Sequence, residues 1–212
     1  HRFDPTLLRD YDLRGTVGRT LQEADAWALG RSFGTIVARS GGRRVAVGYD
    51  GRLSSPMLEA ALVDGLVTTG IDVARIGLGP TPMLYHAEYT GDVDGGIQIT
   101  GSHNPPNYNG FKMVFQGRPF FGADIQQLGE VAAAGEWEDG TGSVIDRPLI
   151  DAYVERLLEG LDGIDPASLA DIRIGWDAGN GSAGPALEKL AAQSLAPLQS
   201  RELDFIPFSL AV

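Results

Sequence analysis

The sequence predicts an α/β protein whose mixed, mostly parallel sheet is sandwiched by helices. Short apolar segments rich in β-branched residues alternate with longer segments that have helical spacing, which is the pattern of βα units. The chain has 29 glycines among 212 residues, and many of them stand at the ends of apolar runs, where short turns are needed. A composition of 43% hydrophobic and 21% charged residues supports a packed core.

Strands and helices can be assigned in order along the first part of the chain. Thr20 to Glu23 has the pattern of a capping box before the first helix. Ser55-Pro56 is a favourable start for the second helix, and Gly70 suits the position after its end. The predicted strands cover residues 44–48, 72–78, 96–100 and 111–115. The predicted helices cover residues 24–38, 55–69, 81–89 and 124–134.

The segment from Gly135 to Ser143 is polar, turn-rich and without a period, so it predicts the end of a first domain. We divide the chain into a first domain, residues 1–145, and a partial second domain, residues 146–212. The second part contains a predicted helix over 149–161, a strand over 172–176 and a helix over 185–193. One strand cannot form a sheet, and so short a segment rarely buries a sufficient core. We therefore expect an incomplete second α/β domain.

Charge and composition exclude several classes of site. With 28 acidic and 17 basic residues the formal net charge is −11, which disfavours nucleic acids and anionic membrane surfaces as partners. The chain has no cysteine and three histidines, so we expect no disulfide, no thiol chemistry and no His/Cys zinc site. No apolar run is long enough to span a bilayer, and no signal-peptide pattern opens the chain. The expected protein is soluble and cytoplasmic.

The stretch TGSHNPPNYNGFK, residues 100–112, concentrates groups that could carry chemistry. Ligands of α/β sheets gather at the carboxyl ends of strands, and Ser102 directly follows a predicted strand. Gly101 lets the backbone approach a ligand closely, and successive N–H groups in such a turn can face an anion. His103 could move a proton or pair with a phosphate, and Lys112 supplies a point charge suited to phosphate.

The residues alone leave two other interpretations of this loop open. Ser102, His103 and Asn104 could simply satisfy the backbone groups of a turn that Pro105 and Pro106 stiffen. A serine hydrolase is the second alternative. It is the weaker one, because the second residue after Ser102 is not the glycine that a G-x-S-x-G elbow requires.

Five segments taken together resemble the α-D-phosphohexomutases, the phosphomannomutase/phosphoglucomutase family, and particularly its bacterial members. The loop matches T-G-S-H-N-P-x-x-x-N-G-[FY]-K, which is similar to the family's long and specific phosphoserine signature. The other similar segments are FDPTLLRDYDLRG (3–15), VGYDGRLSS (47–55), GLGPTPM (77–83) and DAGNG (177–181). We interpret the last of these as framework that opens a second family domain.

The resemblance implies a reaction and a role for several residues. Family members shift a phosphoryl group between C1 and C6 of a hexose through a phosphoserine and a bisphosphate intermediate. Ser102 would be that phosphoserine, and its phosphate would contribute an oxygen ligand to Mg²⁺. Arg14 and Lys112 would stabilise the phosphate charge or assist proton transfer, and His103 would support the loop and the phosphate.

The resemblance also implies how substrate is bound. Tyr11 and Asn104 would bind the hexose phosphate, and a hexose 1,6-bisphosphate would act as activator. We interpret Arg52, by contrast, as a structural salt-bridge residue.

The chain departs from the family pattern by lacking three expected loops. These are the D-G-D-G-D loop that would supply most Mg²⁺ ligands, the G-E-x-S-G-H loop that selects the sugar, and a final phosphate loop. We therefore expect a truncated form that is inactive alone. The alternative is a non-catalytic module that binds a phosphosugar or a partner, with the apolar tail over residues 205–212 driving self-association.

Overall fold

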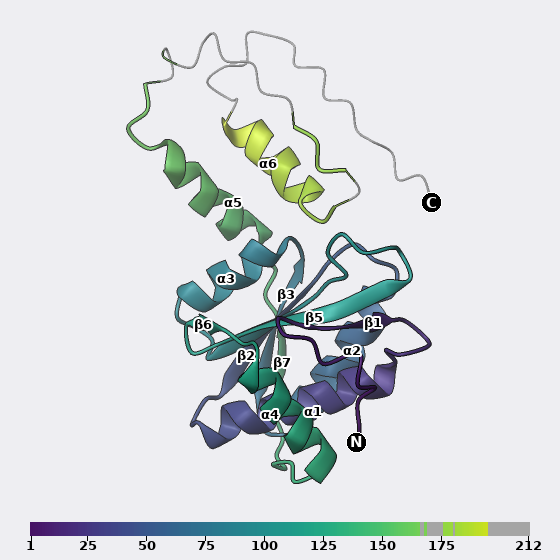
Figure 1. Ribbon diagram of the computed structural model, residues 1–212. Helices are drawn as coiled ribbons and strands as arrows, with labels where there is room; N and C mark the ends of the chain where they lie inside the picture. The colour runs from purple at the N-terminus through teal and green to yellow at the C-terminus, as the bar shows by residue number, and fades with distance from the viewer. Residues whose placement is uncertain (166–167, 169–175, 180, 195–212) are drawn as a thin grey trace.

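The computed structural model describes residues 1–165, 168, 176–179 and 181–194 (Figure 1). The strands are β1 (Leu13–Thr16), β2 (Arg44–Tyr49), β3 (Asp72–Leu78), β4 (Gly95–Ile99), β5 (Tyr108–Phe115), β6 (Arg118–Pro119) and β7 (Val144–Asp146). The helices are α1 (Glu23–Arg39), α2 (Ser55–Val67), α3 (Thr81–Tyr89), α4 (Ala123–Ala134), α5 (Ile150–Leu158) and α6 (Gly184–Ser194), with a 3₁₀ turn, η1 (Glu159–Leu161). Strands and helices alternate as far as β4, as the sequence predicts.

The seven strands form one sheet in the order β1-β5-β4-β2-β3-β7, with β6 paired to β5. β2 is parallel to β3 and β4, and β3 is parallel to β7. β5 is antiparallel to β1, β4 and β6. Every strand of this sheet except β5 therefore runs in the same direction, which confirms the predicted mixed, mostly parallel sheet. The carboxyl ends of β1, β2, β3 and β4 consequently meet at one edge.

One face of the sheet packs against α1, α2 and α4, which lie together on one side of it in Figure 1. Alternate residues of neighbouring strands, such as Ile97 of β4 and Phe111 of β5, point into this core. Phe33 of α1 is fully buried there and meets Phe115 and Phe120 edge to face, with centroid distances of 6.0 and 5.4 Å. Burial of this continuous apolar face is the main stabilising contribution to the fold.

The opposite face divides into an apolar half and a polar half. α3 packs Met83 and Leu84 against Ala46 of β2 in a second, smaller core that includes Val114 of β5. Further toward the carboxyl edge, the same face carries two polar residues in register, Gln98 of β4 and Lys112 of β5. Gln98 is buried, whereas the Lys112 side chain is about one-third exposed, at 30%. We call this second region the polar half of the sheet.

Most predicted elements lie within two residues of the observed ones, but the structure adds β1, β6 and β7. These strands are 4, 2 and 3 residues long, too short to display a period. The predicted capping box at Thr20 to Glu23 is wrong. α1 begins after Gln22, whose N–H donates to the Asp25 carboxylate at 2.8 Å, and Thr20 Oγ1 accepts a hydrogen bond from the Thr16 N–H instead.

The polar segment over residues 135–143, which predicted the end of a first domain, packs against the helices of the sheet domain. The Gly142 N–H donates to the Val67 carbonyl at 2.8 Å, and Trp137 meets Trp27 of α1 edge to face at 5.4 Å. The segment then continues into β7, which extends the sheet beside β3. The division at residues 145 and 146 stays a prediction.

Beyond the sheet, α5 and α6 lie side by side (Figure 1) and are linked by a Lys189–Asp151 ion pair of 2.7 Å. The helix predicted over 149–161 is observed as α5 followed by η1. Residues 172–175 of the next predicted strand and the whole apolar tail lie outside the described residues. In the described ranges, no helix is both long and apolar enough to cross a membrane.

Candidate active site

The loop between β4 and β5 presents Ser102 at the carboxyl edge of the sheet. The Thr100 N–H still donates to the Gly110 carbonyl at 2.9 Å, so the chain leaves the sheet only after that residue. Ser102 is exposed and has a φ of 53°, a left-handed conformation that is uncommon for residues other than glycine. Its N–H donates to Thr100 Oγ1 at 2.9 Å, and its Oγ lies 3.4 Å from Nδ1 of His103.

Arg52, on the loop after β2, binds the backbone of the Ser102 loop. Its guanidinium donates to four carbonyl oxygens, those of Ser102 (2.9 Å), Asn104 (2.7 Å), Pro105 (2.7 Å) and Tyr108 (2.9 Å). Its Nε lies 3.3 Å from the Asp50 carboxylate. The structural salt bridge predicted for Arg52 is thus confirmed, and the contacts with the loop backbone add to it.

Asp50, the partner of Arg52, is buried and connects the two loops. Its carboxylate accepts hydrogen bonds from the Gly101 N–H (3.1 Å), the Arg52 N–H (3.1 Å) and the Ser55 hydroxyl (2.7 Å). Ser55 Oγ in turn accepts from Nδ2 of Asn109 at 2.9 Å. These buried polar groups satisfy one another, which is the condition for such a network to hold a single conformation.

Arg14 and Lys112 are brought together by a residue that the sequence interpretation did not select. The Asp12 side chain is 7% exposed and accepts from both cations, from Nη2 of Arg14 in a short contact and from Nζ of Lys112 at 3.4 Å. Two cations share one carboxylate, so the cluster has a net positive formal charge. Such a site favours an anionic ligand.

The register of the sheet places this cluster at the same edge as the serine loop. Arg14 lies opposite Gly110 on β5, and Gly110 is bonded to Thr100 at the base of the loop. Lys112 follows Gly110 by two residues on β5 and so lies on the same face, in the polar half of the sheet. The structure therefore joins two groups of predicted site residues at one edge, although they come from positions about 90 residues apart in the sequence.

The two residues predicted to bind substrate occupy different settings. Tyr11 is 74% exposed and stacks on Phe121, with ring centroids 6.2 Å apart and planes 20° from parallel. Asn104 uses its Nδ2 within the loop, where it donates to the Gly101 carbonyl at 2.9 Å. Tyr11 is thus an open aromatic surface, whereas Asn104 also supports the turn.

Three contributors escaped the sequence interpretation: Asp12, Asp50 and Phe121. Asp12 and Asp50 stand inside the segments DYDLRG and GYDGR, so the signal that could have found them was a carboxylate beside an arginine at i+2. Phe121 has no comparable signal, because its contact with Tyr11 depends on chain folding across more than a hundred residues.

The residues present do not form a complete Mg²⁺ site. Across the described part of the chain, no group of three or more His, Cys, Asp or Glu side chains is placed to hold a metal ion. Mg²⁺ prefers several oxygen ligands in octahedral geometry, and from this chain the family resemblance implies only one, a phosphate oxygen on Ser102. The described residues could therefore supply at most a fraction of its coordination.

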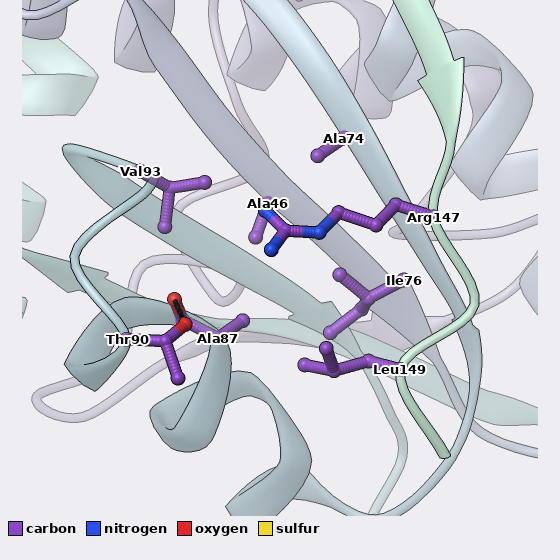
Figure 2. Close-up of a pocket in the computed structure, with 8 residues that line it drawn as sticks. All are labelled: Ala46, Ala74, Ile76, Ala87, Thr90, Val93, Arg147 and Leu149. Atoms are coloured by element: carbon purple, nitrogen blue, oxygen red, sulfur yellow. Dashed lines mark hydrogen bonds between the residues drawn. The ribbon is translucent and has the colours of Figure 1, made fainter. Parts of the chain in front are cut away.

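A small cavity elsewhere has no part in this site (Figure 2). It lies under α3 on the apolar half of the sheet, and Arg147 extends across it while forming an ion pair with Asp92 at 2.6 Å. Its volume is about 10 Å³, room for roughly one water molecule. The lining residues are Ala46, Ala74, Ile76, Ala87, Thr90, Val93, Arg147 and Leu149.

The family comparison covers the sheet domain. Residues 5–139 match the model of the phosphoglucomutase/phosphomannomutase α/β/α domain I. That range contains the serine loop, the Asp12 cluster and the Asp50–Arg52 pair.

Relatives from several bacteria match most of this chain. It is 38% identical to a phosphomannomutase/phosphoglucomutase of Pseudomonas aeruginosa, over 91% of this chain and 41% of that protein. It is 40% identical to a phosphoglucomutase of Neisseria gonorrhoeae, over 87% of this chain and 39% of that protein. The chain therefore spans about two fifths of the length of these curated relatives.

Solved structures agree with the sequence comparisons. A phosphoglucomutase/phosphomannomutase family protein from Burkholderia thailandensis superposes with a TM-score of 0.77 at 40% identity, covering 89% of this chain and 42% of that one. A protein from Thermus thermophilus described as a phosphomannomutase superposes with a TM-score of 0.73 at 24% identity, covering 88% of this chain and 43% of that one. The second match supports the fold alone.

Proposed function

The chain belongs to the phosphoglucomutase/phosphomannomutase family, and we propose that its Ser102 carries the phosphoryl group that is moved between C1 and C6 of a hexose phosphate. The observation that carries this proposal is the exposed hydroxyl of Ser102, held in a left-handed turn at the carboxyl edge of the sheet. A positively charged cluster at the same edge supports it.

In the proposed loading step, Ser102 Oγ attacks a phosphorus atom of a hexose 1,6-bisphosphate. The new P–Oγ bond forms, the bond from phosphorus to the sugar oxygen breaks, and a hexose monophosphate leaves. His103 Nδ1, 3.4 Å from Oγ, takes the serine proton and returns it to the departing sugar oxygen. Transfer from phosphoserine to the free C1 or C6 hydroxyl of a hexose phosphate runs the same step in reverse.

Lys112 and Arg14 supply the positive charge that the transferring phosphoryl group requires. Fixed cations near developing negative charge lower the barrier because they need no reorganisation during the reaction. Asp12 holds both cations in place and neutralises one of them. Tyr11 offers an aromatic surface at the margin of the site for the sugar ring, and Asn104 completes the proposed substrate contacts.

The full isomerisation is proposed for the whole protein, because the chain spans about two fifths of its curated relatives. For the residues in hand the proposal is the phosphoserine half-reaction. Mg²⁺ and a hexose 1,6-bisphosphate activator belong to the same proposal, but Mg²⁺ is assigned no step, since the described residues do not complete its site. A cytoplasmic location and self-association through residues 205–212 are proposed on the sequence alone.

The test is uptake of phosphate from glucose 1,6-bisphosphate. The purified chain is incubated with this compound and Mg²⁺, and intact-mass analysis measures how much of it gains one phosphoryl group. We expect uptake in the unmodified chain and in Ser40→Ala, whose hydroxyl caps α1 away from the loop, and none in Ser102→Ala. Equal uptake in Ser102→Ala would refute the proposal.

A coupled mutase assay with mannose 1-phosphate or glucose 1-phosphate extends the test. Uptake of phosphate without turnover would place the complete reaction beyond this chain. Turnover that Ser102→Ala abolishes would mean that this chain also supplies the remaining sugar and metal contacts.

The serine-hydrolase alternative gains little from the geometry. A hydrolase triad needs an acid that orients the histidine. In the part of the chain that the structure describes, the hydrogen bond found for the His103 ring is the one to Ser102. A fluorophosphonate probe should leave Ser102 unlabelled, and stoichiometric labelling there would favour the hydrolase instead.

A further inference from the structure

Arg52 uses its whole set of hydrogen-bond donors on the structure around Ser102. A guanidinium has five N–H groups in a planar fork. Four of them donate to the carbonyls of residues 102, 104, 105 and 108, and the fifth, on Nε, faces Asp50 at 3.3 Å. No donor of Arg52 is then available for a phosphate, even though the side chain lies directly beside Ser102.

Two further observations show that the loop is built around this guanidinium. A Cβ atom added to Gly101 would lie 2.3 Å from Cζ of Arg52, so the guanidinium rests against a backbone that has no side chain. Asp50 binds the Gly101 N–H and the Arg52 N–H as well as the Arg52 side chain. Both ends of the arginine are therefore fixed.

The left-handed backbone conformation of Ser102 explains why so many contacts are made to this loop. A non-glycine residue with positive φ costs free energy and persists only where its surroundings hold it. Arg52 binds the carbonyl of Ser102 itself and those that follow it, while Asp50 binds the N–H that precedes it. The two side chains thus grip the backbone on both sides of the strained residue.

We propose that Arg52 and Asp50 are positioning residues that hold Ser102 in its left-handed conformation, and that Arg52 does not bind the transferred phosphate. The proposal deepens the proposed function and rests on it for its catalytic consequence. It differs from the usual expectation for an arginine beside a phosphorylated serine, which would be a direct phosphate ligand. It also predicts that lysine cannot replace Arg52, because lysine keeps the charge but has three donors and no fork.

The experiment compares Arg52→Lys and Arg52→Ala with a matched control, Arg118→Ala. Arg118 is an exposed arginine that pairs with Asp124 on α4, and it lies opposite Phe115 at the end of β5 away from the serine loop. Hydrogen exchange reports the loop conformation at the Gly101, Ser102 and Asn104 amides. Phosphate uptake from glucose 1,6-bisphosphate reports the chemistry.

We expect both Arg52 variants to exchange the loop amides at least about tenfold faster, while β4 and β5 amides keep their rates. We expect the rate of phosphate uptake to fall by about 10²-fold, since misplacement of a reacting group by an ångström has an effect of that size. Millimolar guanidinium should partly restore uptake in Arg52→Ala and leave Arg52→Lys unchanged. A general loss of folding would not be rescued in this way.

A further variant tests the positioning role without changing Arg52 itself. Gly101→Ala keeps Arg52 but places a methyl group where the guanidinium lies, so it should reproduce the faster loop exchange. If the loop amides keep their rates in the Arg52 variants while uptake falls, Arg52 acts on the phosphate and the positioning role is wrong. If the unmodified chain takes up no phosphate, the proposed function fails, and the exchange rates still decide the positioning role.

Discussion

The two faces of the sheet differ in how far apolar packing covers them. The face against α1, α2 and α4, which we call the covered face, is mostly apolar, although Arg75 of β3 forms an ion pair with Glu59 of α2 there. The opposite face is apolar only where α3 covers it, and toward the carboxyl edge it carries Gln98 and Lys112 on the same strands. On the opposite face of β5, Val114 lies in the second core, whereas Lys112, nearer the carboxyl edge, lies in the candidate site.

The polar half differs from the covered face in the kind of side-chain interaction that it contains. On the covered face the large apolar side chains need only complementary shape, and the charged Arg75 and Glu59 pair with each other. On the polar half, Asp12, Arg14 and Lys112 form a partly buried charge cluster whose members depend on one another.

The largest effect is expected on the covered face. Phe33→Ala should reduce the free energy of unfolding by about 3–5 kcal/mol, since it leaves a cavity between Phe115 and Phe120. Urea unfolding measures the change. Tyr89→Ala truncates an aromatic ring that is 85% exposed and should stay within about 0.5 kcal/mol of the parent. Similar losses for the two variants would contradict the assigned core.

The next largest effect is expected on the rate of phosphate uptake, with little change in the free energy of unfolding. Lys112→Met should slow phosphate uptake by about 10²–10³-fold, because it removes a cation that we propose stabilises the transferring phosphoryl group. The free energy of unfolding should change by no more than about 1 kcal/mol, since Asp12 keeps Arg14 as its partner. Lys189→Met, which breaks the exposed pair with Asp151, is the control for uptake. Unchanged uptake in Lys112→Met would remove this residue from the site.

A smaller effect is expected at the border between the two halves. A Cβ atom at Gly48 would lie 2.6 Å from Gln98 Oε1 and 2.9 Å from Ile76 Cγ1, both buried. Gly48→Ala should therefore cost about 1–3 kcal/mol by overpacking and disturb the bond from Gln98 Nε2 to the Gly79 carbonyl. Gly51→Ala, with open space around it, should be nearly neutral. Equal stability of the two variants would show that Gln98 moves freely.

The smallest effect concerns a carboxyl group buried on α2. Burial raises the pKa of Glu59 above its ordinary value of 4.5, and the ion pair with Arg75 offsets only part of this. The folded state then binds the proton more tightly than the unfolded state, so this contribution to stability declines as pH rises from about 4.5 through the raised pKa. Glu59→Gln should lose that decline.

Stability measured by urea unfolding at several pH values provides the test for Glu59. Asp124→Asn is a control of opposite sign. The hydrogen bond from Arg118 lowers the pKa of Asp124 below 3.8, so its stabilising contribution is lost as pH falls. A steeper decline above pH 4.5 in Glu59→Gln than in the parent would contradict the burial argument.

The alternation of apolar and helical segments was sufficient to predict the central elements. β3 and α3 begin and end at the predicted residues, because their patterns are local and their ends carry glycine or proline. β1 and β7 were missed because they become strands only by pairing with β5 and β3, and 3 or 4 residues show no period of their own. The candidate site divides in the same way.

The sequence by itself determined that Ser102 follows a strand, that His103 adjoins it, and that the loop belongs to a recognisable family, since all three are properties of contiguous residues. Only the tertiary structure decided what holds that loop and what charges it faces. Arg52 binds carbonyls about 50 positions away, and Asp12 meets Lys112 across 100 positions. Such contacts depend on strand order and register, which are settled by packing of the whole sheet and not by local pattern.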